Sequence, residues 1–387
     1  MKDVPISVAL IEPVGGHGGM DGYDLGLCRG LIAAGCQVSY YTCDETVLTD
    51  MPGLRFYPVF RGIYGASHPL IRAARYVVGA LKAYARIVRE HDTMCHLHVF
   101  HGSMTELFLI ALAKLCGKKV VLTVHDVETF AGPGGPSRTI ISKAYQAADW
   151  LIVHNEVSKA ELIETLGVSV NKISVVPHGN FLHTLDIIPD REEARNSLEI
   201  ERSARVILFF GHIKQVKGLD LLLEAMPSVV SAVPAAMLLI AGRPWKSDFL
   251  VYEAQMARLG IESYCRCHIG FVADDHVATY FAAAELVVLP YRRIYQSGVV
   301  LQAMSYSKAV VVSDLPGMTE IVRDKVNGYT FPSADIQKLS EALIRALSDD
   351  AERSSMAANG LEYIRRYHDW YQIGEATANI YRAVLAS

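Results

Sequence analysis

The sequence predicts an α/β protein in which two doubly wound parallel-sheet domains follow one another. Short apolar runs, rich in β-branched residues, alternate along the chain with segments whose apolar residues recur at helical spacing. Apolar strands separated by helices are typical of a parallel sheet that helices cover on both faces. The runs that predict strands are 6–11, 38–42, 96–100, 120–124, 150–153 and 173–176, and then 206–210, 237–241, 268–271, 286–290 and 309–313.

The alternation is interrupted once, which sets the expected domain boundaries. The 387 residues are sufficient for two domains of ordinary size. We expect a first domain at 1–185, a linker at 186–203, where Pro189 lies in a polar, charged stretch, and a second domain at 204–366. Residues 367–387 are predicted to form a C-terminal helix that packs back toward the first domain.

Composition and charge exclude several broad classes of protein. Hydrophobic residues make up 51% of the chain, which is enough for full cores, so general disorder is excluded. A net charge of −4 gives no overall attraction to nucleic acid. The seven cysteines are scattered, which favours a reducing compartment over a disulfide framework. Because no apolar run could span a bilayer and the N-terminus lacks a signal-peptide pattern, we expect a cytoplasmic protein, at most attached to the inner face of a membrane.

The candidate site lies in the loops after the apolar runs, because doubly wound sheets bind ligands at the carboxyl ends of their strands. Gly15 and Gly16 open a glycine-rich loop before a predicted helix, which suits contact with a phosphate or a sugar. The loop does not match the dinucleotide pattern G-x-G-x-x-G, and it could also be an ordinary strand–helix turn. His125 ends another run; it could face a ligand or bond a neighbouring carbonyl group.

Two further loops carry features of an anion site. Lys214 and Lys217 lie three residues apart after Gly211 and before a predicted helix, so we predict that they hold a diphosphate. The alternative is a solvated basic turn. Ser297 and Gly298 stand at the start of another predicted helix, whose N–H groups could bind phosphate oxygens, although Ser297 could also be a plain helix cap.

The order of these motifs along nearly the whole chain resembles the retaining glycosyltransferases of family 4, also called glycosyl transferases group 1. The motifs are VVLTVHD, VVPHG, FFGHIKQVKGLDLLLEA, LLIAGRP, HIGFV, LVVLPY, QSGVVLQAMSYSKAVVVSD, LPGMTEIV and NGYTF. The resemblance implies the GT-B fold, in which two Rossmann-like domains face a cleft. The first domain would serve the acceptor, and the second would bind the nucleotide sugar.

The resemblance also implies roles for single residues. Lys214 and Lys217 match the basic pair that grips the donor diphosphate, and His125 matches a histidine near the transferred sugar; these three would be catalytic. The expected donor-binding residues are Gly15, Gly16, Gly211, Arg243, Phe271, Val272, Ser297, Gly298 and Gln302. Arg243 and the strand end at Phe271 and Val272 match the region that holds the base.

Three positions depart from the family pattern. Many members have an arginine where this chain has His212. The Glu-x7-Glu pattern falls on Ile294 and Gln302. Gln302 keeps an acceptor oxygen for a ribose, whereas Ile294 cannot contact a sugar hydroxyl. A non-catalytic or weakly active relative, or a nucleotide-sugar epimerase, is therefore the alternative to an active transferase.

The predicted reaction is retaining hexosyl transfer (class EC 2.4) from a nucleoside diphosphate sugar to a glycan, glycolipid or small-molecule acceptor, as in polysaccharide or glycoconjugate assembly. No cofactor and no metal are expected. Asp-x-Asp is missing, and the spacings of His96, His98 and His101 and of Cys265 and Cys267 do not favour a metal site.

A basic segment in the first domain suggests a second kind of partner. Residues 51–89 carry no acidic side chain and seven basic ones: Arg55, Arg61, Arg72, Arg75, Lys82, Arg86 and Arg89. Apolar residues recur at helical spacing from Leu70 to Val88. A basic amphipathic helix can lie on anionic lipid, and the alternative is an ordinary surface helix.

Overall fold

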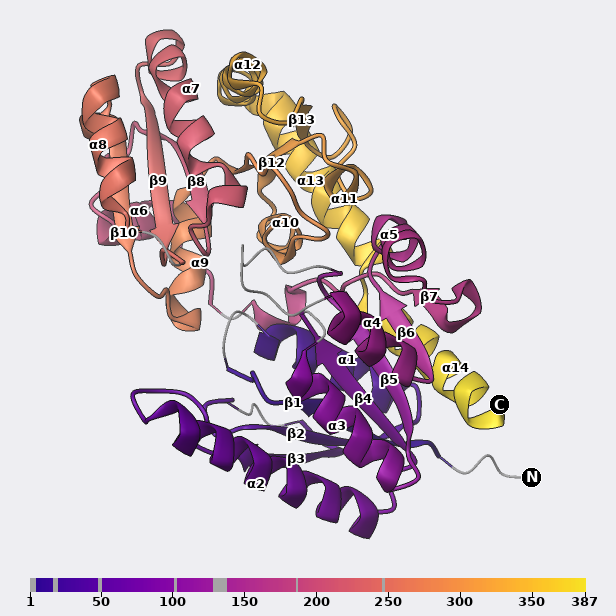
Figure 1. Ribbon diagram of the computed structural model, residues 1–387. Helices are drawn as coiled ribbons and strands as arrows, with labels where there is room; N and C mark the ends of the chain where they lie inside the picture. The colour runs from indigo at the N-terminus through magenta and orange to yellow at the C-terminus, as the bar shows by residue number, and fades with distance from the viewer. Residues whose placement is uncertain are drawn as a thin grey trace. The chain divides into compact units, whose positions relative to one another are not determined.

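The computed structural model describes residues 5–16, 20–47, 51–100, 103–127, 138–185, 187–245 and 248–387. The chain forms two compact units (Figure 1). The first contains residues 1–179 and 368–387, and the second contains residues 180–367.

The described residues of the first unit form a seven-stranded parallel sheet with the order β3-β2-β1-β4-β5-β6-β7. Its strands are β1 (Ser7–Glu12), β2 (Gln37–Cys43), β3 (Leu54–Phe60), β4 (Met94–Val99), β5 (Lys119–Val124), β6 (Trp150–Val153) and β7 (Ile173–Val175). Its helices are α1 (Met20–Ala33), α2 (Pro69–Arg89), α3 (Met104–Leu115), α4 (Arg138–Ala147), α5 (Glu156–Leu166) and α14 (Trp370–Ala386). The strand order reverses at β1, so right-handed crossovers place α1 and α3–α5 on opposite faces.

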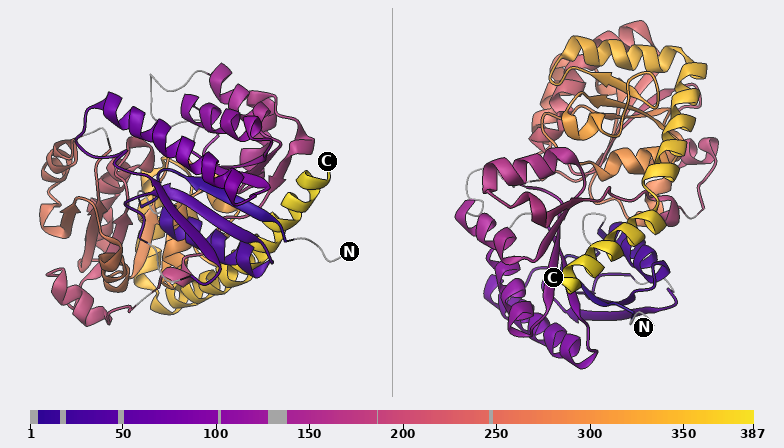
Figure 2. Two further views of the ribbon diagram at one scale, coloured as in Figure 1. Left: turned by 90° about the horizontal axis from the view of Figure 1, so that it is seen from below. Right: turned by 90° about the vertical axis from the view of Figure 1, so that its right-hand side faces the viewer.

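Helix α14 packs directly on α1, which assigns the end of the chain to the first unit (Figure 2). The two helices meet at glycines: a Cβ on Gly30 would lie 2.0 Å from Trp370 O, and one on Gly374 would lie 2.0 Å from the carbonyl carbon of Gly30. Glycine is therefore required on both helices for the backbones to approach this closely. The far end of α14 is held by Tyr381, whose hydroxyl is 2.5 Å from His96 Nδ1.

The described residues of the second unit form a six-stranded parallel sheet with the order β10-β9-β8-β11-β12-β13. Its strands are β8 (Arg205–Phe210), β9 (Ala236–Gly242), β10 (Cys265–Ile269), β11 (Leu286–Leu289), β12 (Ala309–Ser313) and β13 (Tyr329–Phe331). Its helices are α6 (Arg191–Ser197), α7 (Leu219–Ala232), α8 (Leu250–Leu259), α9 (Asp274–Ala283), α10 (Gly298–Ser305), α11 (Pro316–Thr319), α12 (Ile336–Ser348) and α13 (Asp350–Tyr367).

Both faces of this second sheet are covered, which explains why its inner strands β9, β8, β11 and β12 are almost entirely apolar. Ile207 and Phe209 belong to one buried cluster, whereas Val206 and Leu208, which alternate with them along β8, belong to another. Successive side chains of a strand point to opposite faces, so each face has its own core.

The structure differs from the predicted linker at 186–203. Residues 191–197 form helix α6 and belong to the second unit. Arg195 is buried there, and its Nη2 donates to both carboxylate oxygens of Glu285 at 2.8 and 3.0 Å. This charged segment is therefore part of a folded domain, in which Glu285 pairs with its buried Arg195.

Candidate functional site

The candidate site of the second unit begins where β8 ends. Gly211 follows β8, and its N–H donates to Ala241 O at 2.9 Å. Gly242, at the end of the neighbouring strand β9, has a φ of +152°, and a Cβ there would lie 1.8 Å from Gly211 O. Only glycine fits at position 242, so the two strand ends approach closely and the loop after Gly211 starts from a fixed point.

Three cationic side chains, Lys214, Lys217 and Arg243, converge on this loop. A Cβ placed on Gly211 would lie 3.6 Å from Lys217 Nζ. Burial, followed by the charges of these three cations, lowers the pKa of His212 to about 4. His212 is therefore neutral at pH 7, and the positive potential of the loop comes from the lysines and the arginine.

Two aromatic rings, which were not among the predicted site residues, lie beside the lysines. Lys214 Nζ is 5.1 Å from the centre of the Trp245 ring, and Lys217 Nζ is 5.2 Å from the centre of the Tyr291 ring. Cations are attracted to aromatic faces at such distances. The Trp245 and Tyr291 rings therefore help to hold the two lysine side chains beside them.

An ion pair, also absent from the predicted set, fixes the lysine loop to the loop after β11. Both Nη atoms of Arg292 donate to the carboxylate of Asp220 at 2.6 Å, and the backbone N–H of Arg292 donates to Val216 O at 2.8 Å. Gly218 has a φ of +67°, and a Cβ there would lie 1.9 Å from Pro290 O. The backbone on either side of Lys217 is therefore held from two directions.

The N-terminus of α10 lies beside the same loop. A Cβ on Gly211 would lie 3.7 Å from Val299 Cγ2, in the first turn of α10. The buried Ser297 is the N-cap residue, but its side chain makes no capping hydrogen bond. The first N–H groups of a helix carry partial positive charge and bind anions. Lys217 Nζ and the first turn of α10 thus both lie within 4 Å of the position that a Cβ on Gly211 would occupy, and Gln302 is half-buried a turn further into α10.

The residues expected near a nucleotide base lie along the same edge of the sheet. Gly270 follows β10, and its N–H donates to Gly242 O at 3.1 Å. The next residue, Phe271, is 70% exposed, and Arg243, after β9, is also exposed. An exposed aromatic ring beside a strand end offers a flat surface for stacking.

The other predicted residues belong to the first unit, where a row of histidines lies along the carboxyl edge of the sheet. His98 lies in β4, and His125, His154 and His178 follow β5, β6 and β7. Successive ring centres are 5.5, 4.9 and 5.4 Å apart. Tyr23 of α1 contacts all four rings edge-on, with ring centres 4.7 to 5.5 Å away.

Sequence reasoning selected only His125 from this row. The signal it missed is that consecutive apolar runs are each followed closely by a histidine. The alternative reading, in which His125 bonds a carbonyl group, fits its neighbour instead: His154 Nδ1 is 3.0 Å from Val176 O, and His154 Nε2 is 3.2 Å from His125 Nδ1.

Two buried carboxyl groups stand at one end of the row. Asp24 Oδ1 lies 2.8 Å from His98 Nδ1, and its Oδ2 accepts a hydrogen bond from the Tyr40 hydroxyl at 2.6 Å. Burial, and then the proximity of Asp24, raises the pKa of Glu12 well above its ordinary value, and burial raises that of Asp24. Burial lowers the pKa of His98 to about 3. Burial thus favours the neutral forms of both the carboxyl groups and the His98 imidazole.

The predicted glycine loop is only partly described. A Cβ on Gly15 would lie 2.2 Å from Thr46 Oγ1, and one on Gly16 would lie 2.5 Å from Glu45 O. Both glycines are thus needed to pack the loop against the end of β2. Residues 17–19 of this loop lie outside the described residues, as does His101.

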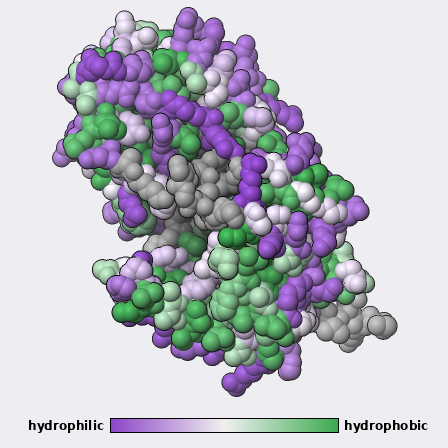
Figure 3. Space-filling view, in the orientation of Figure 1, coloured by the Kyte–Doolittle hydropathy of each residue, from purple (hydrophilic) through white to green (hydrophobic). Residues whose placement is uncertain are grey.

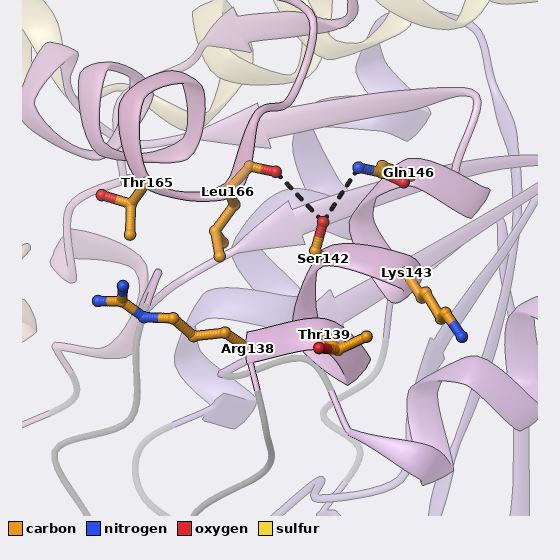
Figure 4. A pocket seen from close by; sticks show the side chains of 7 residues that line it. All are labelled: Arg138, Thr139, Ser142, Lys143, Gln146, Thr165 and Leu166. Carbon is orange, nitrogen blue, oxygen red and sulfur yellow. Dashed lines mark hydrogen bonds between the residues drawn. The ribbon is translucent and has the colours of Figure 1, made fainter.

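Two further features of the described residues lie apart from the candidate site. No group of three or more His, Cys, Asp or Glu side chains among them could hold a metal ion. A surface pocket of about 380 Å³ lies between α4 and the end of α5, but no predicted site residue lines it (Figure 4). In this pocket, Ser142 Oγ donates to Leu166 O at 3.2 Å and accepts a hydrogen bond from Gln146 Nε2 at 3.0 Å.

Comparison with known families and proteins gives consistent matches. The family model described as Glycosyltransferase Family 4 matches residues 17–180, and the model described as Glycosyl transferases group 1 matches residues 190–363. A phosphatidyl-myo-inositol mannosyltransferase of Mycobacterium leprae is 31% identical over 76% of this chain and 74% of its own length. An uncharacterized glycosyltransferase of Methanocaldococcus jannaschii is 28% identical over 95% of each chain.

Solved structures of low sequence identity share the fold. A sucrose-phosphate synthase from Thermosynechococcus elongatus has a TM-score of 0.80 at 19% identity, covering 98% of this chain and 99% of its own. The Anabaena protein HepE, in complex with UDP-glucose, has a TM-score of 0.74 at 17% identity, covering 98% of this chain and 100% of its own. The two-sheet GT-B fold that the motif order predicted is thereby confirmed.

Proposed function

This chain belongs to the group 1 glycosyltransferases of family 4, enzymes that transfer a sugar from a nucleotide sugar, and we propose that it does so with retention at the anomeric carbon and without a metal ion. One observation carries the proposal. Lys217 and the first turn of α10 both lie close to Gly211, and the charges of Lys214 and Arg243 act on the same loop through His212.

A nucleoside diphosphate is the ligand that these cations and this helix N-terminus suit best. Its two phosphates carry the negative charge that the cations and the helix N–H groups attract. The backbone turn at Gly211 lets a phosphate approach closely, and Arg243 and Phe271 stand where a base would be held. Because HepE is described in complex with UDP-glucose, a uridine donor is the first to assay.

The same groups would assist the chemical step. When the bond between the anomeric carbon and the diphosphate oxygen breaks, the electron pair remains on the diphosphate. Lys214, Lys217 and the start of α10 would stabilise that developing charge in place, which is electrostatic catalysis by preorganised groups. The acceptor hydroxyl forms its new bond on the same face and passes its proton to the departing phosphate oxygen. His125 would contact the transferred sugar.

The acceptor is a hydroxyl group of a glycan, glycolipid or small molecule. The relative from Mycobacterium leprae is described as acting on phosphatidyl-myo-inositol, and another, from Nocardioides, on D-inositol 3-phosphate. Inositol derivatives are therefore the first acceptors to test beside simple glycans.

Acceptor-dependent release of nucleoside diphosphate tests the proposal. We expect release only when donor and acceptor are both present, in buffer with a chelator, and we expect Lys217→Ala to reduce it about tenfold or more, as loss of a charged phosphate contact does. Lys338→Ala is the matched control, because Lys338 pairs with Glu341 on the exposed side of helix α12. Nucleotide binding without release of nucleoside diphosphate would instead favour a non-catalytic relative. The presence of Ile294 where the family pattern has a carboxylate supports that alternative.

We also propose that helix α2 contacts an anionic membrane surface. Most of the large apolar residues that recur from Leu70 to Val88 are exposed, although Tyr84 is buried: Leu70, Val77, Val78, Leu81 and Val88 are 42–74% exposed. An ordinary surface helix would bury such a stripe, and here Ala80, Ala83, Tyr84 and Ile87 form the buried side instead. Figure 3 shows apolar and hydrophilic residues mixed over this part of the surface.

Charge supports lipid as the occupant of this face. Arg72, Arg75, Lys82, Arg86 and Arg89 lie on α2, which carries no acidic residue. Basic residues beside an apolar stripe attract anionic headgroups while the stripe enters the acyl boundary. Among the helices of the described residues, none has the length and apolarity to cross a bilayer. The contact is therefore proposed as a surface contact.

Sedimentation with vesicles that contain anionic lipid tests this contact. We expect binding at low salt that weakens as salt is added and that Val78→Ser/Leu81→Ser abolishes. The matched control is Leu250→Ser/Val251→Ser, an equally exposed apolar pair on α8. Equal binding to neutral vesicles, or no binding, would contradict the proposal.

A further inference from the structure

A chain of hydrogen bonds runs from a backbone carbonyl through two histidines of the buried row. His154 Nδ1 lies 3.0 Å from Val176 O, and a carbonyl oxygen can only accept, so Nδ1 carries the hydrogen. Burial lowers the pKa of His154 to about 4 and that of His125 well below its ordinary value, so both rings are neutral at pH 7. A neutral imidazole has one N–H group.

The tautomer of His125 follows from this. Because His154 donates from Nδ1, its Nε2 must accept, and the partner at 3.2 Å is His125 Nδ1. His125 therefore donates from Nδ1, and its Nε2 has only a lone pair. Among the described residues, no group hydrogen-bonds this buried Nε2 atom.

The ring of His125 is also held in place. Phe100 stacks on one face, with ring centres 5.1 Å apart, and Tyr23 packs edge-on with ring centres 4.9 Å apart. His125 itself is 92% buried, since its exposed fraction is 8%. A buried acceptor without a donor is costly to the folded state, so the position is suited to a ligand that brings the donor.

We propose that His154 is a positioning residue, which fixes His125 in the tautomer whose Nε2 accepts a hydrogen bond from a hydroxyl group of the transferred sugar. The inference rests on the proposed function, because it takes His125 as the residue near that sugar. It adds a direction: the sugar must donate and His125 must accept. A sugar whose hydroxyl is replaced by fluorine, hydrogen or a methyl ether at that position cannot donate.

The tautomer can be measured without turnover. Nitrogen NMR of the ring-labelled, unliganded chain distinguishes Nδ1–H from Nε2–H, and His125→Phe assigns the signals. We expect Nδ1–H for His125 in the natural chain and in His154→Gln, whose amide can donate to Val176 O and accept from His125. In His154→Leu the preference should be lost. Nε2–H in the natural chain, or an unchanged tautomer in His154→Leu, would overturn the inference.

The direction of the sugar contact is tested with a series of donors in which one hydroxyl at a time is replaced by fluorine. We expect one position to lower kcat/KM about five- to tenfold in the natural chain and in His154→Gln, as loss of one hydrogen bond does. In His154→Leu, fluorine at that position should lower kcat/KM by a smaller factor. His178→Leu is the matched control, since His178 is the next buried ring of the row and its Nδ1 bonds Gly179 O.

The outcomes separate the two proposals. A fluorine series that gives the same pattern in His154→Leu and His178→Leu would contradict the role of His154 even if transfer is observed. The expected tautomers without transfer from any donor would contradict the proposed function alone.

Discussion

The buried histidine row predicts a specific loss of stability on acidification, which replacement of one histidine should remove. The pKa of His154 is lowered from 6.5 to about 4, chiefly by burial. Between these values the unfolded chain binds a proton that the folded chain does not. The stabilisation is therefore fully present above pH 6.5 and is lost as the pH falls toward 4.

The magnitude follows from the shift. On acidification from pH 7.5 to 5, only the interval below the unfolded pKa of His154, about 1.5 pH units, changes the stability. At about 1.36 kcal/mol per unit, this one group lowers the free energy of unfolding by about 2 kcal/mol. The buried acids Glu12 and Asp24 have raised pKa values, so they affect stability in the opposite sense. The dependence of total stability on pH is therefore the sum of these contributions. The difference between the natural chain and His154→Gln isolates the histidine.

The assay is urea unfolding of both chains at pH 7.5 and pH 5. A Trp245→Phe background leaves Trp150 and Trp370, both in the first unit, as fluorescent reporters. The free energy of unfolding of the natural chain, relative to the variant, should fall by about 2 kcal/mol between the two pH values. The same substitution at an exposed histidine, His276→Gln, is the control. A difference that stays constant within about 0.5 kcal/mol would refute the reasoning.

Three further changes have definite expected results. Gly30→Ala places a methyl group 2.0 Å from Trp370 O, so we expect the free energy of unfolding to fall by about 3 kcal/mol; an unchanged urea midpoint would contradict the close helix crossing. Arg292→Met releases the loop that Asp220 holds, and calorimetry should show nucleotide affinity weakened about tenfold; unaltered affinity would mean that the loop needs no such restraint. Asp24→Asn removes a carboxyl group whose pKa is raised by burial, so the variant should gain stability relative to the natural chain as the pH rises from 5 to 8; a flat difference would show that this group does not resist ionisation.

Most of the strands could be predicted because central parallel strands are apolar on both faces. The strands that were missed lie at sheet edges. β3 contains Arg55 and Pro58 and is mostly half-buried, and β13 has three residues, so neither shows a long apolar run. Helix α6 was taken for a linker because the partner of Arg195, Glu285, is 90 residues away in sequence.

In the candidate site, too, features set by neighbouring residues could be predicted, whereas features that depend on residues far apart in the sequence could not. The spacing of Lys214 and Lys217 is local, and the sequence alone selected both. The ion pair of Arg292 with Asp220 joins residues 72 positions apart, and nothing near either residue indicates it. The histidine row depends on strand register, which pairs Val124 with Val153 and so places His125 and His154 just after the ends of the neighbouring strands β5 and β6. Register follows from packing of the whole sheet, so the hydrogen bond between His125 and His154 could not be predicted from sequence spacing.

The measurement that tests the central claim most directly is calorimetric titration of the full chain with nucleoside diphosphates in buffer with a chelator. We expect that one of them, with UDP tested first, binds at a single site, and that Lys217→Ala weakens this binding about tenfold or more while Lys338→Ala leaves it unchanged. Binding of equal strength in Lys217→Ala, or no binding of any nucleoside diphosphate, would contradict a diphosphate site built on Gly211, Lys217 and the start of α10.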